Sequence, residues 1–342
     1  MTTNDQELYE EIVNIVNNYD EVLTDEDLTV LDGIYKIFND AEFERLHPRD
    51  KDGKFTRVGS SGEHTPSKEY QKTLERVKES NNRNITPNEV IANAVKAYGL
   101  NEFEVRKHIK KASEYNNKVR ENNSDTKNRF SKDGVYTEER QQKHLEILSK
   151  IFKNKEKAKP KDGEKPTAIF LGGRGGSGKS KFDGLVYDKS KYIVLDADEI
   201  KNELDEYKGF NAAEVHEESS DILNRALKKA REEGLNVVLD ATMKTQTSAE
   251  KKIKAFADAN YNIEMYYMHL PREKAAERAI GRFAERDRKF NGRYVPLEVI
   301  LNDMKHNEEN FDVLKKYASK WAFYNNDVPS PDDPPILVDK NY

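Results

Sequence analysis

Short apolar runs alternate with amphipathic segments through the second half of the chain. The runs have the length of buried strands and lie at residues 167–173, 192–198, 236–242, 263–270 and 321–327. Apolar residues at helical spacing occupy the intervals at residues 178–186, 211–233, 247–259, 271–288 and 296–318. Because strands that alternate with helices form parallel sheets, this pattern predicts an α/β domain with flanking helices on both faces of its sheet.

The first half of the chain has mostly helical patterns. Thr86, Pro87 and Glu89 have the residue types and the spacing of a helix start, and Gly99 is a typical helix end. Residues 86–99 are therefore predicted to form one compact helix.

These patterns divide the chain into four parts. We expect N-terminal helices over residues 1–46, a linker rich in Gly, Ser, Pro and charge over residues 47–67, a helical region of unknown role over residues 68–135, and the α/β domain over residues 136–342. The last part opens with an amphipathic helix at residues 136–152.

Composition narrows the class of protein. The chain has 342 residues, of which 35% are hydrophobic and 35% are charged, and its net charge is -5. This charge gives no general attraction to nucleic acid or to an anionic membrane. The absence of cysteine excludes disulfides and thiolate metal sites and is compatible with a reducing cytoplasm. With neither a signal-peptide pattern nor an apolar run long enough to span a bilayer, we expect a cytoplasmic protein.

The stretch AIFLGGRGGSGKSKF, residues 168–182, carries the first candidate chemistry. Its G-x-x-x-x-G-K-S pattern follows an apolar run, as in loops whose backbone N–H groups surround a phosphate. Lys179 would reach the β- and γ-phosphates, and the Ser180 hydroxyl would bind Mg²⁺. The sequence thus predicts ATP and Mg²⁺ as cofactors, with ATP held by Gly173, Arg174, Gly175, Gly176, Ser177, Gly178, Lys179 and Ser180.

Acidic residues follow two of the predicted strands. Asp196 and Asp198 come at the end of one, and Asp240 and Thr242 come at the end of the next. Ligands of parallel sheets bind at the carboxyl ends of the strands, so these carboxylates could hold Mg²⁺ or accept a proton from an attacking hydroxyl. The alternative is that each Asp only caps the helix that follows it.

The segment at residues 278–296 is dense in arginine. Phosphoryl transfer needs positive charge on the migrating group, and the planar guanidinium supplies it through several donors. A solvated basic helix face is the alternative. Several other classes lose support, since the chain has no N-K-x-D element of a regulatory GTPase, no metal-ligand spacing among its histidines, no G-x-S-x-G and no H-E-x-x-H.

Taken together, residues 136–327 resemble the zeta toxin family of P-loop kinases. FLGGRGGSGKS is similar to the family's phosphate loop, and YIVLDADEIK is similar to its second strand. GLNVVLDATMKT resembles the segment that contacts the acceptor, and VHEESSDILNRA, residues 215–226, is similar to an acceptor-side helix. Arg282 lies eleven residues after Pro271, and Arg293 stands just before YVP, as the two phosphate-clamping arginines of the family do.

The resemblance implies a kinase that transfers the γ-phosphate of ATP to a hydroxyl of a nucleotide-linked sugar such as UDP-N-acetylglucosamine. It implies that Asp198 is the catalytic base. The remaining roles it implies are phosphate stabilisation by Lys179, Arg282 and Arg293 and acceptor binding by Asp240, Thr242 and Ser219. This chain has Asp240 where the best-known members carry Glu, which widens the acceptor pocket by about a methylene.

The resemblance also implies a partner, because a small helical antitoxin usually blocks the ATP site of the family. The helices before residue 136 would serve either as a built-in inhibitor or as an adaptor. The segment HPRDKDGKFT, residues 47–56, is similar to segments of phage head and tail proteins. It keeps open a virion-associated protein with an accessory nucleotide domain, and a nucleic-acid end kinase, which needs a basic groove, is the third alternative.

Overall fold

The computed structural model describes residues 64–284 and 289–342 of the chain. The predicted helices over residues 1–46, nearly all of the predicted linker and the phage-like segment lie outside the described residues, as do residues 285–288 of the arginine-dense segment. Residues 65–131 and 136–342 form one compact unit, which contains the six-stranded sheet and every predicted site residue.

The helices are α3 (Lys68–Asn82), α4 (Pro87–Tyr98), α5 (Glu102–Glu121), α6 (Thr126–Phe130), α7 (Glu138–Ile151), α8 (Ala197–Asn202), α9 (Ala212–Glu232), α10 (Gln246–Asp258), α11 (Arg272–Ala284) and α12 (Asn307–Leu314). The strands are β1 (Ser131–Lys132), β2 (Val135–Tyr136), β3 (Thr167–Gly172), β4 (Ile193–Asp196), β5 (Val237–Asp240), β6 (Asn262–His269), β7 (Lys320–Asn325) and β8 (Ile336–Lys340). Short 3₁₀ and π turns join them, as η1 (Lys155–Ala158), η2 (Lys179–Phe182), η3 (Lys189–Lys191), η4 (Val299–Asp303) and η5 (Lys315–Tyr317).

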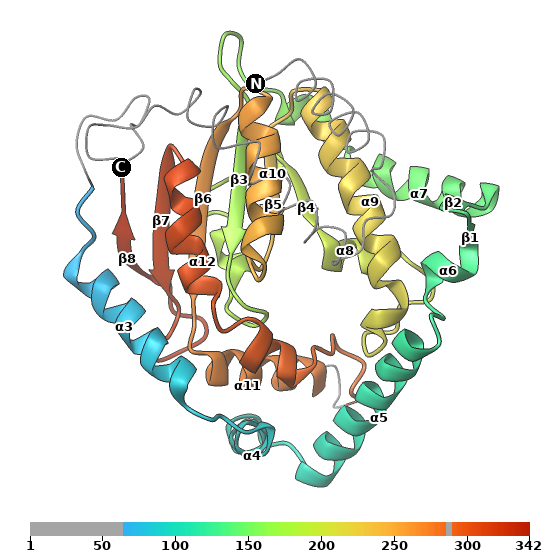
Figure 1. Ribbon diagram of the computed structural model, residues 1–342, viewed down its shortest axis with the longest axis vertical. Coiled ribbons are helices and arrows are strands. Elements are labelled where there is room, and N and C mark those ends of the chain that lie inside the picture. The colour runs from blue at the N-terminus through green and yellow to red at the C-terminus, as the bar shows by residue number, and fades with distance from the viewer. Residues whose placement is uncertain (1–63, 285–288) are drawn as a thin grey trace, which may run out of the picture. The chain divides into compact units, whose positions relative to one another are not determined.

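The main sheet has the strand order β4-β5-β3-β6-β7-β8 (Figure 1). Its first five strands are parallel, as the alternating pattern predicts, and β8 pairs antiparallel with β7 at the edge. The sequence analysis did not identify β8, whose Ile336 and Leu337 are exposed. The α/β prediction for the fold class is confirmed.

Among residues 64–284 and 289–342, helices cover one face of the sheet. Side chains of α3, α7, α9, α10 and α12 pack against the alternate strand residues that include Phe170, Leu239 and Phe323. The opposite face, with Leu171 and Met268, packs against residues 182–192, which contain only short 3₁₀ turns. For the described part of the chain, the prediction of helices on both faces is therefore wrong.

The missing helix is the one expected over residues 178–186, directly after the glycine-rich loop. The chain makes a single 3₁₀ turn over Lys179–Phe182 and then bends at Gly184, which has φ 79°. A positive φ cannot continue a right-handed helix. Phe182 instead turns into the core against Tyr266 and Tyr324.

The single helix expected over residues 296–318 is also interrupted. A π turn at Val299–Asp303 ends before α12 begins at Asn307. Arg272 donates to the Leu301 carbonyl, and Asn81 donates to the Lys305 carbonyl. Side chains from other elements thus satisfy carbonyls that a continuous helix would use internally.

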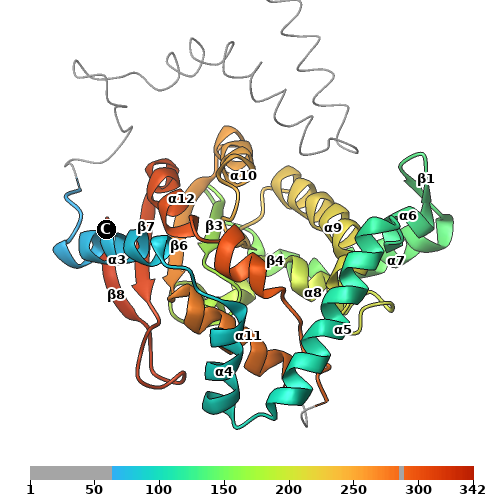
Figure 2. The same cartoon turned by 60° about the horizontal axis from the view of Figure 1, so that its bottom comes forward.

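Helices α3, α4 and α5 run round the α/β domain from the β8 edge of the sheet to α9 (Figures 1 and 2). Along the chain they contact first β8 and α12, then α11, and finally α9. The predicted start and end of α4 are confirmed, since Thr86 and Glu89 form a reciprocal capping box and Gly99 is left-handed. The exposed Tyr98 ring lies against Gly281 of α11, where a Cβ atom would be 2.8 Å from it.

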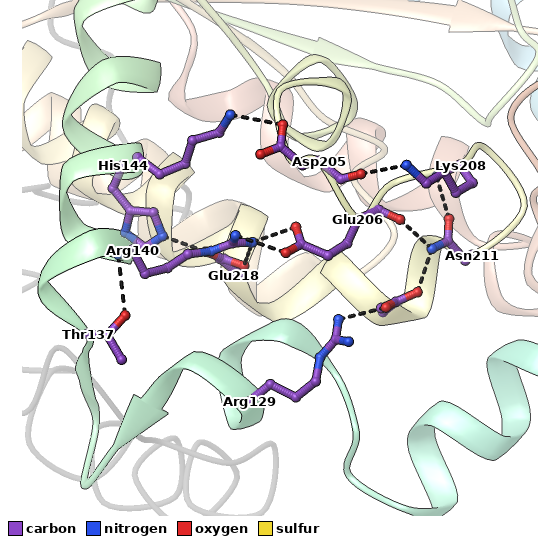
Figure 3. Close-up of polar contacts among 11 residues, drawn as sticks. Arg129, Thr137, Arg140, His144, Asp205, Glu206, Lys208, Asn211 and Glu218 are labelled. Carbon is purple, nitrogen blue, oxygen red and sulfur yellow. Dashed lines mark hydrogen bonds and ion pairs between the residues drawn. The ribbon is translucent and has the colours of Figure 1, made fainter.

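Helix α9 has a second, acidic face that binds the preceding helical region (Figure 3). Glu218 is fully buried and accepts two hydrogen bonds from Arg140. The Nε2 atom of His144 lies 2.6 Å from Oε1 of the same carboxylate. One helical turn earlier, Glu214 pairs with Arg129 at 2.6 Å. These ion pairs tie α6 and α7 to α9, so that α9 is held on both sides.

We predict that Glu218→Gln lowers the free energy of unfolding by about 3 kcal/mol at pH 7, because it breaks a buried ion pair. Glu232→Gln, at an exposed position of the same helix, is the matched control. Urea unfolding of the full chain measures both, and equal midpoints for the two variants would contradict the prediction.

The difference should depend on pH. Burial acts to raise the pKa of Glu218, but hydrogen bonds from His144 and Arg140 lower it from 4.5 to about 2. The stabilisation by the carboxylate is therefore complete above about pH 4.5 and is lost as the pH falls toward 2. The gap between wild type and Glu218→Gln should narrow in that window.

Candidate active site

Parallel pairing brings the ends of three strands to one level. Asp196 of β4 is the register partner of Asp240 of β5, and Asp240 is the partner of Leu171 of β3. The glycine-rich loop leaves β3 two residues later, at Gly173. The loop and both carboxylates therefore meet at the same edge of the sheet, where ligands of such folds bind.

The loop has the backbone conformation that the glycine pattern implies. Gly176 and Gly178 have φ values of 89° and 91°, and a Cβ atom on either would lie within 2.5 Å of a neighbouring atom. The neighbour of Gly178 is Asn326, a fully buried residue that follows β7. Asn326 donates to the Ser177 carbonyl at 2.7 Å and accepts from Lys181 at 3.0 Å. These two bonds attach the loop to the end of β7.

The donors of this loop fit a phosphate chain. Within the described ranges, the N–H groups of Gly175, Gly176 and Gly178 donate to no backbone carbonyl, and the buried Ser177 hydroxyl has no hydrogen-bond partner. Unpaired buried donors are costly, and an anion would satisfy them. Lys179 lies over the loop, with its Nζ 2.9 Å from the Gly173 carbonyl and 3.5 Å from Asp240.

The Arg174 side chain has a structural partner, so its predicted part in ATP binding would come from the backbone of the loop. Arg174 is buried and turned away from the loop interior, where it forms a bidentate ion pair with the fully buried Glu308 of α12. His269, at the end of β6, contacts the same carboxylate at 2.8 Å. A buried acid requires such partners, and the pair anchors the loop to α12.

Asp198 lies at the centre of the charged groups. Arg293 contacts one of its oxygens, and Lys201 lies 3.3 Å from the other. Burial acts to raise the pKa of Asp198, but Arg293, Lys201 and Lys179 together lower it. The carboxylate is thus ionised at neutral pH and remains partly accessible, with 24% of its side chain exposed.

The two neighbouring acids have the opposite shift. Burial and the charge of Asp240 raise the pKa of Asp196 to about 6, and its carboxylate also accepts the Asp198 N–H at 2.8 Å. Burial raises the pKa of Asp240, against the effect of Lys179. The three carboxylates at this sheet edge repel one another. Such a cluster favours the binding of a cation or a role in proton transfer.

The other predicted arginine, Arg282 of α11, has its backbone carbonyl beside Gly292, the residue that precedes Arg293. Burial raises the pKa of the Tyr207 hydroxyl, on which the charges of Arg293, Asp198 and Arg282 all act. The charges of Arg282 and Arg293 thus both act on Tyr207, and Arg293 contacts Asp198. Tyr207, Lys201 and Asn326 have no motif in the sequence, and sequence analysis did not find them.

The predicted acceptor residues have different surroundings. Thr242 lies in the loop after β5, which Asn307 and Asn310 of α12 hold by hydrogen bonds to the carbonyls of residues 242–244. Asp240 contacts Lys179, as described above. Ser219 is buried on α9, and its hydroxyl donates to the His216 carbonyl within the same helix.

No group of three or more His, Cys, Asp or Glu side chains among residues 64–284 and 289–342 has the arrangement of a metal site. The exposed Ser180 hydroxyl and one carboxylate of the edge could share Mg²⁺ with phosphate oxygens, which is how this ion is usually held. In the same part of the chain, no helix has the length and apolar character to cross a membrane.

The family model for zeta toxin matches residues 149–327, which include the loop, the acidic edge and both arginines. This chain belongs to the zeta toxin family. Members of the family are phosphotransferases. No curated protein matches the chain at a significant level.

Similar solved structures come from two systems. One is the PezAT chromosomal toxin–antitoxin system of Streptococcus pneumoniae, with 17% identity over 60% of this chain and 81% of that one and a TM-score of 0.45. The others are AvrRxo1-ORF1:AvrRxo1-ORF2 complexes. The complex with sulphate ions has 17% identity, covers 60% and 69% of the two chains and has a TM-score of 0.47. The complex with ATP has 16% identity, covers 60% and 68% and has a TM-score of 0.48.

We predict that Arg174→Met lowers the free energy of unfolding by about 3–5 kcal/mol, because it leaves the carboxylate of Glu308 without its buried partner. Arg174→Met combined with Glu308→Gln should recover most of this loss and still bind ATP, whereas Lys179→Met should not bind ATP. Chemical unfolding and calorimetric titration with ATP provide the measurements. Loss of ATP binding in the stable double variant would show that Arg174 contacts phosphate.

Proposed function

We propose that this protein is an ATP-dependent kinase that transfers the γ-phosphate to a hydroxyl of a nucleotide-linked sugar, such as UDP-N-acetylglucosamine, and that it acts as a toxin. The observation that carries the proposal is the position of Asp198. Its carboxylate contacts Arg293 and is close enough to Lys179 for that charge to lower its pKa. A base, a phosphate-binding lysine and a guanidinium thus meet at one sheet edge.

The proposed reaction uses these groups directly. Asp198 accepts the proton of the acceptor hydroxyl, and the resulting oxygen attacks the γ-phosphorus of ATP. A new oxygen–phosphorus bond forms while the bond from phosphorus to the β,γ-bridging oxygen breaks, and ADP leaves with that electron pair. Lys179, Arg282 and Arg293 stabilise the negative charge on the transferring group, and the loop N–H groups hold the β-phosphate.

Mg²⁺, bound through Ser180 and phosphate oxygens, would supply further neutralisation of charge. The ionised state of Asp198 suits its role, because a protonated carboxyl could not accept a proton. Its lowered pKa makes it a weak base, so positioning must contribute most of the rate increase.

The acceptor class is proposed from the resemblance of the segment with Asp240 and Thr242 to the family's acceptor-binding segment. Asp240 ends β5 and lies 3.5 Å from Lys179. We also propose a helical antitoxin as partner, as is usual in the family. The described residues add no specific observation in favour of a virion-associated protein or a nucleic-acid end kinase.

A panel assay tests the function. The full chain is incubated with labelled ATP, Mg²⁺ and individual UDP-sugars, other nucleotides, oligonucleotides or a bacterial metabolite extract. We expect label on a UDP-sugar, with a mass increase of one phosphate. Labelling of oligonucleotide ends would favour the nucleic-acid kinase, and transfer to water alone would overturn the kinase proposal.

We predict that Asp198→Asn retains ATP affinity but loses phosphoryl transfer by about 10²–10⁴-fold, the usual contribution of a general base. Asp205→Asn is the control, since 80% of the Asp205 side chain is exposed. Single-turnover transfer and ATP titration measure the two effects separately. Turnover of Asp198→Asn at the rate of the control would remove Asp198 from the mechanism.

A further inference from the structure

Helix α5, which precedes the residues matched by the family model, carries a buried polar residue on its packed face. Its fully or nearly buried side chains are Val105, Ala112, Asn116 and Val119. An asparagine among apolar residues is costly unless its amide is fully hydrogen-bonded. The partners of Asn116 therefore indicate why an asparagine lies there.

Asn116 uses its amide to join α5 to the start of α9. Its Nδ2 donates to the carbonyls of Ala112 and Phe210, both at 2.7 Å, and its Oδ1 accepts the N–H of Ala213 at 2.8 Å. Ala213 is in the first turn of α9, where N–H groups have no partner inside the helix.

The residue that should cap α9 is occupied elsewhere. Asn211 makes no side-chain cap bond to α9, because its Oδ1 accepts from the Lys208 N–H and its Nδ2 donates to Glu206 and Glu214. Asn116 thus supplies from α5 the capping oxygen that normally comes from the N-cap residue itself. Only 2% of Asn116 is exposed, so water does not compete for these bonds.

The same helix holds the segment that carries Arg293. His108 of α5 stacks on Phe290, with ring centroids 4.3 Å apart and an interplanar angle of 6°. Tyr294 is buried, and Ser113 of α5 is among the groups that act on the pKa of its hydroxyl. Arg293 is adjacent to Tyr294 and contacts Asp198.

The two segments held by α5 also bind each other. The N–H of Tyr294 donates to the carbonyl of Gly209 at 3.0 Å. Gly209 has φ 83°, and a Cβ atom there would lie 2.4 Å from the Asn291 carbonyl oxygen. Residues 206–214 and 289–295 therefore form one unit attached to α5.

We infer that α5 is a working part of the active site and that Asn116 is a positioning residue for Arg293. It fixes the start of α9 and the 206–211 loop, and the bond between Tyr294 and Gly209 carries this constraint to the guanidinium beside Asp198. This role rests on the proposed kinase function for its effect on phosphate transfer. It makes α5 a contributor to the reaction instead of an inhibitor or an adaptor.

Asn116→Ala and Asn117→Ala form a matched pair for the test. Asn117 is the next residue of α5, exposed, and its Oδ1 accepts only a 3.3 Å contact from Arg120 among the described hydrogen bonds. The probe is labelled ATP with UDP-N-acetylglucosamine or, where another panel compound is phosphorylated, that compound.

We expect Asn116→Ala to lower the transfer rate by about tenfold or more, because small misplacements of charged groups have large effects on rate. Its ATP affinity should change by less than about twofold, since the phosphate loop is not touched. Asn117→Ala should behave as wild type. Transfer by a folded Asn116→Ala at the rate of Asn117→Ala would overturn the inference.

Hydrogen–deuterium exchange of the full chain gives a readout that does not need the acceptor. Asn116→Ala should increase exchange in residues 206–214 and 289–295 and leave residues 167–182 unchanged. An increase across all three segments would overturn the inference, because Asn116 would then support the whole fold. If wild type phosphorylates no compound, the proposed function fails, while the exchange pattern still decides the positioning role.

Discussion

The parallel register of β3, β4 and β5 is the constraint on which the site depends. It ends the three strands at one level, so that the phosphate loop leaves β3 beside Asp196 and Asp240. Asp198 lies two residues after the end of β4. Like charges at this spacing repel, and Lys179, Lys201 and Arg293 offset the repulsion from three different segments. Contacts between the surrounding helices hold the segments that carry these three residues.

Two buried carboxylates contribute to these contacts, and each is paired with one arginine and one histidine. Glu218 is paired with Arg140 and His144, and Glu308 is paired with Arg174 and His269. The first group attaches α9 to α7, and the second attaches the phosphate loop to α12. Each joins a segment that borders the site to a helix outside it, at positions where an unpaired charge would be destabilising.

The helices before the family domain also contact segments that border the site. Helix α4 packs its Tyr98 ring against Gly281, next to Arg282, and α5 caps α9 and stacks on the segment of Arg293. The face of the sheet with Leu171 and Met268 is covered differently, by the segment at residues 182–192. A bend at Gly184 replaces the usual helix after the loop, and a few aromatic side chains close that face.

Local order in the sequence determined the loop, the acidic strand ends, the capping of α4 and the parallel α/β class. Each of these depends on residues within a few positions of one another, so spacing and residue type suffice to predict them. The tertiary structure decided which way Arg174 points, which residue caps α9 and how Arg293 approaches Asp198. Arg174 and Glu308 are 134 residues apart, and Asn116 and Ala213 are 97 apart. No short pattern records such pairs, because only packing of the whole chain removes the water that would otherwise satisfy these groups.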